Sequence, residues 1–204
     1  MKEKFLEFYV NKFNCLNSID GLDLSFIPPI VRRRMSALDK LTLSLINKTY
    51  TDNIQYIVFS SQFGQIDRLL KIISQYKECK EVSPNTFSGS VHNYSVSFFL
   101  LNRQISIPYT SLSAGDKSIS MGLLSSVISN YDNVLFCYAD INNDECNSLA
   151  INITKKPTTK SQKYKLKLGN STIEQDKFKD FTDLFSGELT TLKTSDFVIE
   201  RVLQ

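Results

Sequence analysis

The hydrophobic and polar positions along the first 140 residues follow two alternating periods. Residues 38–50 carry apolar side chains every three or four positions, and Ser36 with Asp39 precedes them as a weak capping box, so a helix is expected there. The run IQYIVFSS (54–61) is short, nearly continuous and rich in β-formers, which is typical of a strand buried on both faces. The helical period returns in IDRLLKIISQY (66–76), which predicts a second helix.

The same alternation continues as far as residue 140. A third helical pattern is expected to place four apolar side chains on one face: Val91, Tyr94, Phe98 and Leu101. The run NVLFCYAD (133–140) predicts another buried strand. Strands and helices in alternation indicate an α/β fold, with a mostly parallel sheet and helices on both faces.

Between these elements, IPYTSLSAGDKSISMGLLSSV (107–127) predicts a strand, a sharp turn of small residues and an amphipathic helix. Ile105, Ile107 and Tyr109 alternate along the strand. Pro108 lies among them and removes a ladder donor, so the strand should lie at a sheet edge. Several enzyme families mount a nucleophile on such a strand–turn–helix elbow.

The pattern changes after residue 140. Apolar and polar residues alternate strictly in SLAINITKK (148–156) and QKYKLKLG (162–169). This pattern predicts two strands, each with one solvent-exposed face, joined as a hairpin by a polar loop. DKFKDFTDLF (176–185) predicts a last amphipathic helix, and FVIERVLQ (197–204) fits either a strand or a helix. We expect residues 1–141 to form the core and residues 142–204 to pack on it within the same domain.

Composition narrows the class of function. The chain has 204 residues, 42% of them hydrophobic, which suffices for an ordinary domain core. A formal net charge of +3 without a long basic stripe argues against a nucleic-acid binder. No run of 18 apolar residues could span a membrane, and the first ten residues lack the apolar segment of a signal peptide. We therefore expect a soluble, cytoplasmic protein.

Cysteine and histidine usage limits the possible chemistry. Four cysteines are scattered without metal-binding spacing, so free thiols, no metal and no other cofactor are expected. Ser113 lies in SLSAG, which lacks the first glycine of the hydrolase motif G-x-S-x-G. The single histidine, His92, precedes the elbow instead of following it. A serine-hydrolase triad is therefore excluded.

A second interpretation of the elbow rests on motifs that follow one another in order. These are LSFIPPIVRRRMSALDKLTLSLI (24–46), FSSQFGQ (59–65), SPNTFSGSVHN (83–93) and TSLSAG (110–115). Over residues 20–141 the chain resembles the N-terminal half of the thiolase-fold β-ketoacyl synthases. More narrowly, it resembles the short chain length factors of aryl polyene and related pigment or fatty-acyl pathways. The resemblance implies half a thiolase-like fold, with a mixed, mostly parallel five-stranded sheet and a C-terminal extension of a β-hairpin and a helix.

The resemblance also implies that this half-fold lacks the family's chemistry. Aligning Gly115 and Ile119 with the family puts Leu112 where the synthases carry their nucleophilic cysteine. Leucine has neither an acidic proton nor a lone pair, so it cannot form an acyl intermediate. The synthases also draw two histidines and a lysine from a C-terminal half, whereas this chain has one histidine, ahead of the elbow. No catalytic residue is therefore expected.

The resemblance further implies a partner. In the family, two subunits pair antiparallel through the edge strand that leads into the elbow, which here is the strand of Ile105, Ile107 and Tyr109, ending near Leu112. The candidates for the partner interface and the acyl tunnel are seven residues, and Thr86 and Phe87 are those expected to line the partner's tunnel: Thr86, Phe87, Asn93, Ile105, Ile107, Tyr109 and Leu112. The weaker candidates for contact with an acyl carrier protein are three consecutive arginines: Arg32, Arg33 and Arg34.

Three classes of function follow from these observations. The first is a non-catalytic chain length factor that forms a heterodimer with an active β-ketoacyl synthase, stabilises it and shapes its acyl tunnel, with the carrier protein bound by the complex. The second is an independent acyltransferase that uses Ser113 or a free cysteine such as Cys79 as its nucleophile. Neither nucleophile has a histidine at the position in the sequence where a catalytic base is expected. The third is a stand-alone protein that binds an acyl chain or an acyl carrier protein.

Overall fold

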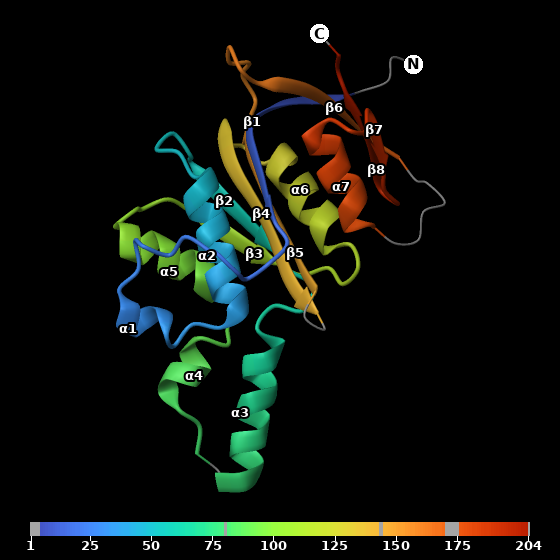
Figure 1. Cartoon of the computed structure of the whole chain (residues 1–204). Helices are drawn as coiled ribbons and strands as arrows, with labels where there is room; N and C mark the ends of the chain where they lie inside the picture. Colours follow the sequence, from blue (N-terminus) through green and yellow to red (C-terminus); the bar gives the residue numbers. More distant parts are fainter. Residues whose placement is uncertain (1–4, 80, 143–144, 170–175, 204) are drawn as a thin grey trace.

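One mixed β-sheet organises the molecule. The computed structural model describes residues 5–79, 81–142, 145–169 and 176–203. Within these ranges the sheet has eight strands in the order β3-β2-β4-β5-β1-β6-β8-β7 (Figure 1). The strands are β1 (Leu6–Leu16), β2 (Tyr56–Ser60), β3 (Tyr109–Leu112), β4 (Asn133–Asn142), β5 (Glu145–Thr154), β6 (Gln162–Leu168), β7 (Thr191–Lys193) and β8 (Phe197–Arg201). The fold is α/β, as predicted.

The expected sheet of five mostly parallel strands was wrong in its detail. Among the strands of the described residues, only the β2–β3 and β2–β4 pairs are parallel. The pairs β4–β5, β5–β1, β1–β6, β6–β8 and β7–β8 are all antiparallel. The βα alternation holds only as far as β4, after which the chain forms antiparallel strands that extend the same sheet.

The expected hairpin of residues 148–156 and 162–169 was also wrong. β1 lies between β5 and β6 and pairs with both of them. The sequence analysis had assigned no strand to residues 6–16. β5 is buried on both faces instead of one, because Leu149 and Ile151 face one core and Ala150 faces the other. β6 does alternate, with Tyr164 and Leu166 buried.

Helices cover both faces of the sheet, as predicted (Figure 1). Helices α2 (Ala37–Thr49) and α5 (Tyr94–Arg103) lie on one face, and α6 (Ser118–Ile128) and α7 (Phe178–Ser186) lie on the other. The capping box of α2 forms, since Ser36 and Asp39 each bond to the other's backbone N–H. The apolar face of α5 differs from the prediction: Val96 and Phe99 are buried, whereas Leu101 is 78% exposed.

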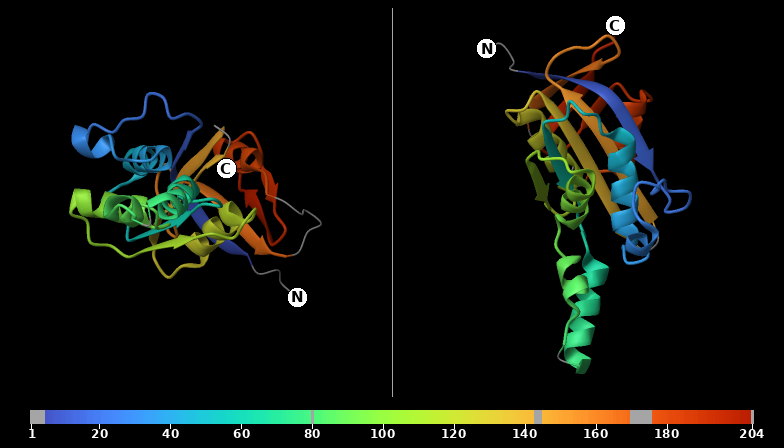
Figure 2. Two further views of the ribbon diagram at one scale, coloured as in Figure 1. Left: turned by 90° about the horizontal axis from the view of Figure 1, so that it is seen from below. Right: turned by 90° about the vertical axis from the view of Figure 1, so that its left-hand side faces the viewer.

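Two further helices form an arm that projects from this body (Figures 1 and 2). They are α3 (Ile66–Cys79) and α4 (Pro84–Ser88), which lie side by side, while the short α1 (Pro29–Arg32) lies close to the base of the arm. The helix predicted for residues 66–76 is therefore confirmed, but its apolar stripe faces outward instead of toward the core. Within the described ranges, no helix is both long and apolar enough to cross a membrane.

Candidate functional site

The predicted elbow is present between β3 and α6. The strand ends at Leu112, and the helix begins at Ser118 after a turn of small residues. Gly115 has a φ of +58°, a left-handed conformation that glycine adopts without steric cost. The Ser118 hydroxyl closes the turn by accepting a bond from the Ala114 N–H (2.9 Å) and donating one to the Gly115 carbonyl (2.7 Å).

The residue at the end of the strand is held firmly but carries no reactive group. The side chain of Leu112 is half-buried against the core beneath α6. Its carbonyl accepts a bond from the Ser61 N–H (3.3 Å) and another from His92 Nε2 (2.9 Å). A carbonyl can only accept, so Nε2 of His92 carries the hydrogen. The only histidine of the chain is therefore committed to the backbone of the elbow.

Gly64 makes room for this histidine. It has a φ of +55°, and a Cβ placed on it would lie 2.6 Å from Nδ1 of His92. His92 lies just before α5, and its bond to the Leu112 carbonyl ties the start of that helix to the elbow.

The alternative nucleophiles are poorly placed for catalysis. The Ser113 hydroxyl is exposed and donates to the Gln62 carbonyl at 3.1 Å, and no hydrogen bond joins it to His92. Cys137 is completely buried, and burial raises the pKa of its thiol far above the usual range, so it is not a thiolate at neutral pH. The side chain of Cys79 lies outside the described residues.

A buried carboxylate that the sequence analysis missed joins the elbow to β2. Asp140, at the end of β4, accepts bonds from the Ser61 hydroxyl (2.5 Å) and from the backbone N–H groups of Gln62 (2.7 Å) and Phe63 (3.0 Å). Gln62 in turn donates from Nε2 to Asp116 in the elbow (2.6 Å). An acidic residue at the end of an otherwise apolar strand pattern, NVLFCYAD (133–140), is the one signal that could have identified this site. We interpret the network as a support for the turn.

The strand that leads into the elbow lies at the edge of the sheet, as predicted. The carbonyls of Pro108 and Leu112 face β2, where they accept from Ile57 and Ser61. Because successive residues of a strand direct their backbone groups to opposite sides, Tyr109 and Ser111 direct theirs outward. The missing N–H of Pro108 lies on the β2 side, so it removes no donor from the open edge.

The other predicted interface residues lie around this edge. Asn93 donates from Nδ2 to the Tyr109 hydroxyl (3.1 Å), and Ile105 and Ile107 are half-buried against the core beneath α5. Phe87 of α4 is 63% exposed, whereas the neighbouring Thr86 is half-buried. The structure brings Asn93 together with the edge strand and places Thr86 and Phe87 on the projecting arm.

The arm carries a run of exposed apolar side chains that we call the α3–α4 surface. Its members are each between 39% and 63% exposed: Ile66, Leu69, Leu70, Ile73, Tyr76 and Phe87. Contiguous apolar patches of more than a few hundred Å² are uncommon on monomers and mark interaction sites. The apolar stripe of residues 66–76 therefore lies on an exposed surface of the arm and not in the core.

One buried carboxylate fixes the arm to the body. Asp39 of α2 is fully buried and accepts bonds from the Ser36 N–H (3.0 Å) and the Ser95 hydroxyl (2.8 Å). From the start of α3 it accepts bonds from Gln65 Nε2 (2.7 Å) and Arg68 Nη2 (2.6 Å). The first turns of α2, α3 and α5 therefore share a single charged centre. The sequence analysis predicted Asp39 only as a capping residue.

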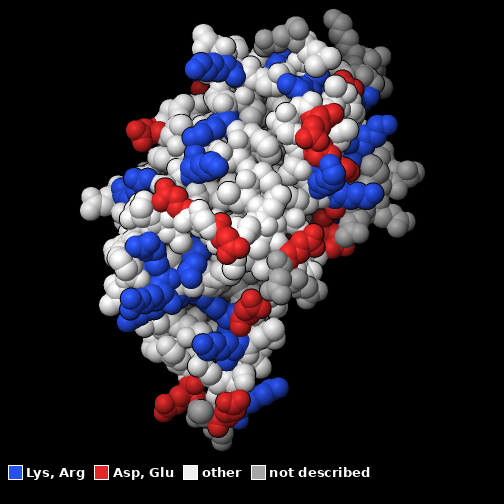
Figure 3. All heavy atoms as spheres, in the orientation of Figure 1, with Lys and Arg blue, Asp and Glu red and all other residues white. Residues whose placement is uncertain are grey.

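Basic side chains gather where the arm meets α1 (Figure 3). A hollow of about 490 Å³ lies there, and its basic residues are Arg34, Arg68 and Lys71. Of the three consecutive arginines predicted as a carrier contact, only Arg34 lines the hollow. Among the residues that the structure describes, no group of histidine, cysteine and acidic side chains could hold a metal ion.

Comparisons with known proteins place these features in a family. The model described as beta-ketoacyl synthase, N-terminal domain, matches residues 11–173. A structure of a ketosynthase (ApeO) in complex with its chain length factor (ApeC) from Xenorhabdus doucetiae matches with a TM-score of 0.69 and 19% identity. This match covers 86% of this chain and 82% of that chain, so the two are similar in length.

A second structure, the ishigamide ketosynthase/chain length factor, matches with a TM-score of 0.57 and 12% identity. The match covers 73% of this chain and 54% of that one, so the present chain spans about half of it. No curated protein matches the chain. At these identities the two structures share a fold with this protein.

The family match is broader than the resemblance found in the sequence. That resemblance ended at residue 141, whereas the family model continues to residue 173 and so includes β5 and β6. It also covers the capped helix α2, the arm and the elbow, which is most of the molecule described above. The chain therefore belongs to the beta-ketoacyl synthase N-terminal domain family and has a thiolase-like fold.

Proposed function

We propose that this protein is a non-catalytic chain length factor that forms a heterodimer with an active β-ketoacyl synthase in polyene, polyketide or fatty-acyl biosynthesis. The observation that carries the proposal is the elbow. It is fully built and held from several sides, yet its strand ends in Leu112 and its only nearby histidine is bonded to the backbone. Such an elbow can support the fold, but it has no nucleophile and no free base with which to catalyse acyl transfer.

The open edge of β3 supports pairing with a second subunit. Tyr109 and Ser111 each offer an outward N–H and carbonyl, with Ile107 next in the same alternation. An unpaired edge of this kind is a template for another strand. An antiparallel strand of the synthase would bond to these groups and continue the sheet into the partner.

The α3–α4 surface supports a second area of contact with the same partner. Its exposed apolar side chains would lose their water contact on docking, which is the main source of affinity at protein interfaces. Phe87 and Thr86 lie on this arm, and we propose that they reach the acyl tunnel of the synthase. A narrow end to that tunnel limits chain length, because forcing extra methylenes into a packed site costs roughly 1–3 kcal/mol.

Co-expression with an active β-ketoacyl synthase from the same organism tests the proposal. The two chains should co-purify as a one-to-one complex on size exclusion. Leu70→Asp, which places a charge on the α3–α4 surface, and Ile107→Asp, at the open edge, should each abolish or greatly weaken the complex. Ile19→Asp is the matched control, because Ile19 is 49% exposed in the loop between β1 and α1 and belongs to neither surface.

Circular dichroism of each variant separates loss of binding from loss of folding. This matters most for Ile107, which is half-buried, and less for Leu70, which is 57% exposed. An undiminished complex with folded Leu70→Asp and Ile107→Asp would contradict the proposed interface. A stable monomer that binds acyl ligand and ignores the synthase would indicate a stand-alone binder instead.

A further inference from the structure

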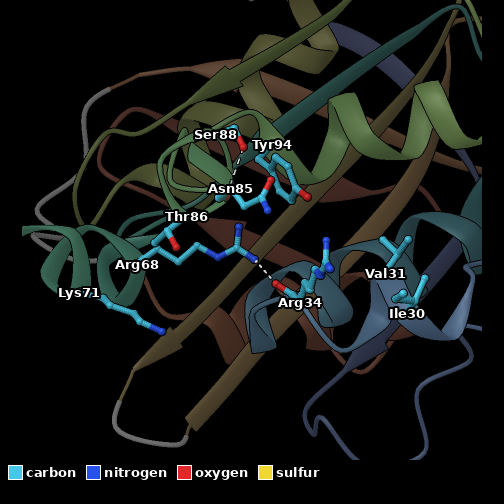
Figure 4. A pocket seen from close by; sticks show the side chains of 9 residues that line it. All are labelled: Ile30, Val31, Arg34, Arg68, Lys71, Asn85, Thr86, Ser88 and Tyr94. Carbon is cyan, nitrogen blue, oxygen red and sulfur yellow. Dashed lines mark hydrogen bonds between the residues drawn. The ribbon is translucent and has the colours of Figure 1, made fainter. Parts of the chain in front are cut away.

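The hollow between α1 and the arm has the chemistry of an anion site. Figure 4 shows its lining, which comes from α1 and the turn after it, α3, α4 and the start of α5. Three lining side chains are cationic and none is acidic: Arg34, Arg68 and Lys71. Arg68 is neutralised by Asp39 beneath it, whereas Arg34 and Lys71 form no ion pair with any residue that the structure describes.

Arg68 is held in place before any ligand arrives. Nη2 donates to Asp39 (2.6 Å) and to the Arg34 carbonyl (3.1 Å), and the guanidinium lies over the Tyr94 ring at 5.2 Å. Figure 4 shows the side chain reaching across the middle of the hollow toward Asn85. A group fixed in this way loses little conformational entropy when it binds an anion.

Gly89 provides the space for this arrangement. Its φ is −82°, which any residue can adopt, so backbone conformation does not require glycine here. A Cβ at this position would lie 1.6 Å from Nη1 of Arg68. The sequence thus leaves room for Nη1 of Arg68, which bonds to neither Asp39 nor the Arg34 carbonyl.

The remaining lining suits a phosphate ester better than a bare ion. Asn85, Thr86 and Ser88 add neutral polar groups on one side, and Ile30 and Val31 add an apolar wall on the other. Guanidinium groups match phosphate oxygens in a bidentate fork. A volume of about 490 Å³ exceeds that of a single phosphate and leaves room for an attached organic group.

We propose that this hollow binds the phosphoryl group of an organic phosphate ester through Arg34, Lys71 and the preorganised Arg68. The ester can come from two sources: the phosphodiester of an acyl carrier's pantetheine arm, or a free phosphoester of similar size. The carrier as a source rests on the proposed function, whereas the phosphate chemistry does not.

Isothermal titration in phosphate-free, low-salt buffer tests the site with 4′-phosphopantetheine, inorganic phosphate and pantetheine as probes. 4′-Phosphopantetheine should bind and pantetheine should not, with inorganic phosphate competing weakly. Arg34→Gln and Lys71→Gln should each weaken binding about tenfold, because each removes a charge-assisted hydrogen bond. Lys77→Gln is the matched control, since Lys77 is an exposed residue of α3 that does not line the hollow, and it should change the affinity less than about twofold.

Holo- and apo-carrier protein distinguish the two sources. Tighter binding of the holo form, lost in Arg34→Gln, would identify the carrier arm, while binding of free 4′-phosphopantetheine alone would identify a free ester. Equal binding of pantetheine and 4′-phosphopantetheine, or unchanged affinity in both pocket variants, would overturn the proposal. Size exclusion of the same samples with the synthase measures formation of the heterodimer and so tests the proposed function separately. Neither pocket variant changes a residue of the α3–α4 surface or of the β3 edge.

Discussion

The buried carboxylate of Asp39 offers a sharp test of how the arm is held. Replacing it with asparagine keeps the size of the side chain but removes its charge. The four bonds it accepts cannot all survive, since an amide has only one acceptor oxygen. Arg68, whose side chain is only 12% exposed, would then lack its counter-ion.

The structure sets the size of the expected effect. Removing one partner of a buried ion pair costs about 3–5 kcal/mol, because the remaining charge stays desolvated. Arg68 borders the hollow and can gain water there, so we expect the lower end, about 3 kcal/mol. For a chain of this length, 1 kcal/mol shifts Tm by roughly 2–4 °C, so Asp39→Asn should lower Tm by roughly 6–12 °C.

Thermal unfolding followed by circular dichroism measures this shift. Asp67→Asn is the matched control, because Asp67 lies exposed in the first turn of α3, and it should change stability by less than about 0.5 kcal/mol. Arg68→Met, alone and with Asp39→Asn, completes a double-mutant cycle. Coupling should make the double variant less destabilised than the sum of the single variants.

The functional consequence can be read in the same samples. Since Asp39 orients the first turn of α3, Asp39→Asn should also weaken the complex with the synthase, and Asp67→Asn should not. A Tm within about 2 °C of the wild type, or a strictly additive cycle, would refute the claim that this centre fixes the arm.

Three further predictions follow from single residues. Leu112→Ala should cost about 1–2 kcal/mol, less than a fully buried leucine, and leave the synthase activity of the complex within a small factor; a thousandfold loss with folding intact would contradict an inert elbow. Gly64→Ala should lower Tm, because it combines a positive φ with a clash against His92 and costs about 1–2 kcal/mol or more; an unchanged Tm would contradict that packing. Burial raises the pKa of Tyr164 to about 12, so the stability from its neutral form is complete below pH 10 and is lost between pH 10 and 12. Absorbance at 295 nm, compared with Tyr164→Phe, should show no ionisation of this residue near pH 10 while the chain is folded.

Local sequence patterns predicted the elements that depend on neighbouring residues. The capping box of Ser36 and Asp39 placed the start of α2, and the Pro108 segment correctly indicated an edge strand. The elbow followed from small residues around Gly115. Each of these features arises from interactions within a few positions of the chain.

Long-range pairing explains most of what was missed. β1 lies between β5 and β6, whose paired residues are 132 to 160 positions away in the sequence, and no local pattern specifies that position. The apolar stripe of α3 predicted a helix but not that its face would be exposed, because periodicity does not reveal what covers it. The basic hollow joins Arg34, in the turn after α1, to Arg68 and Lys71 of α3, and only Arg34 had been singled out.

The most direct test of an inert partner subunit is intact-mass spectrometry of the purified complex after loading with an acyl donor. The account predicts one copy of each chain, with the acyl group on the synthase alone and this protein at its unmodified mass. An acyl adduct on this protein, particularly when it is purified without the synthase, would contradict the account.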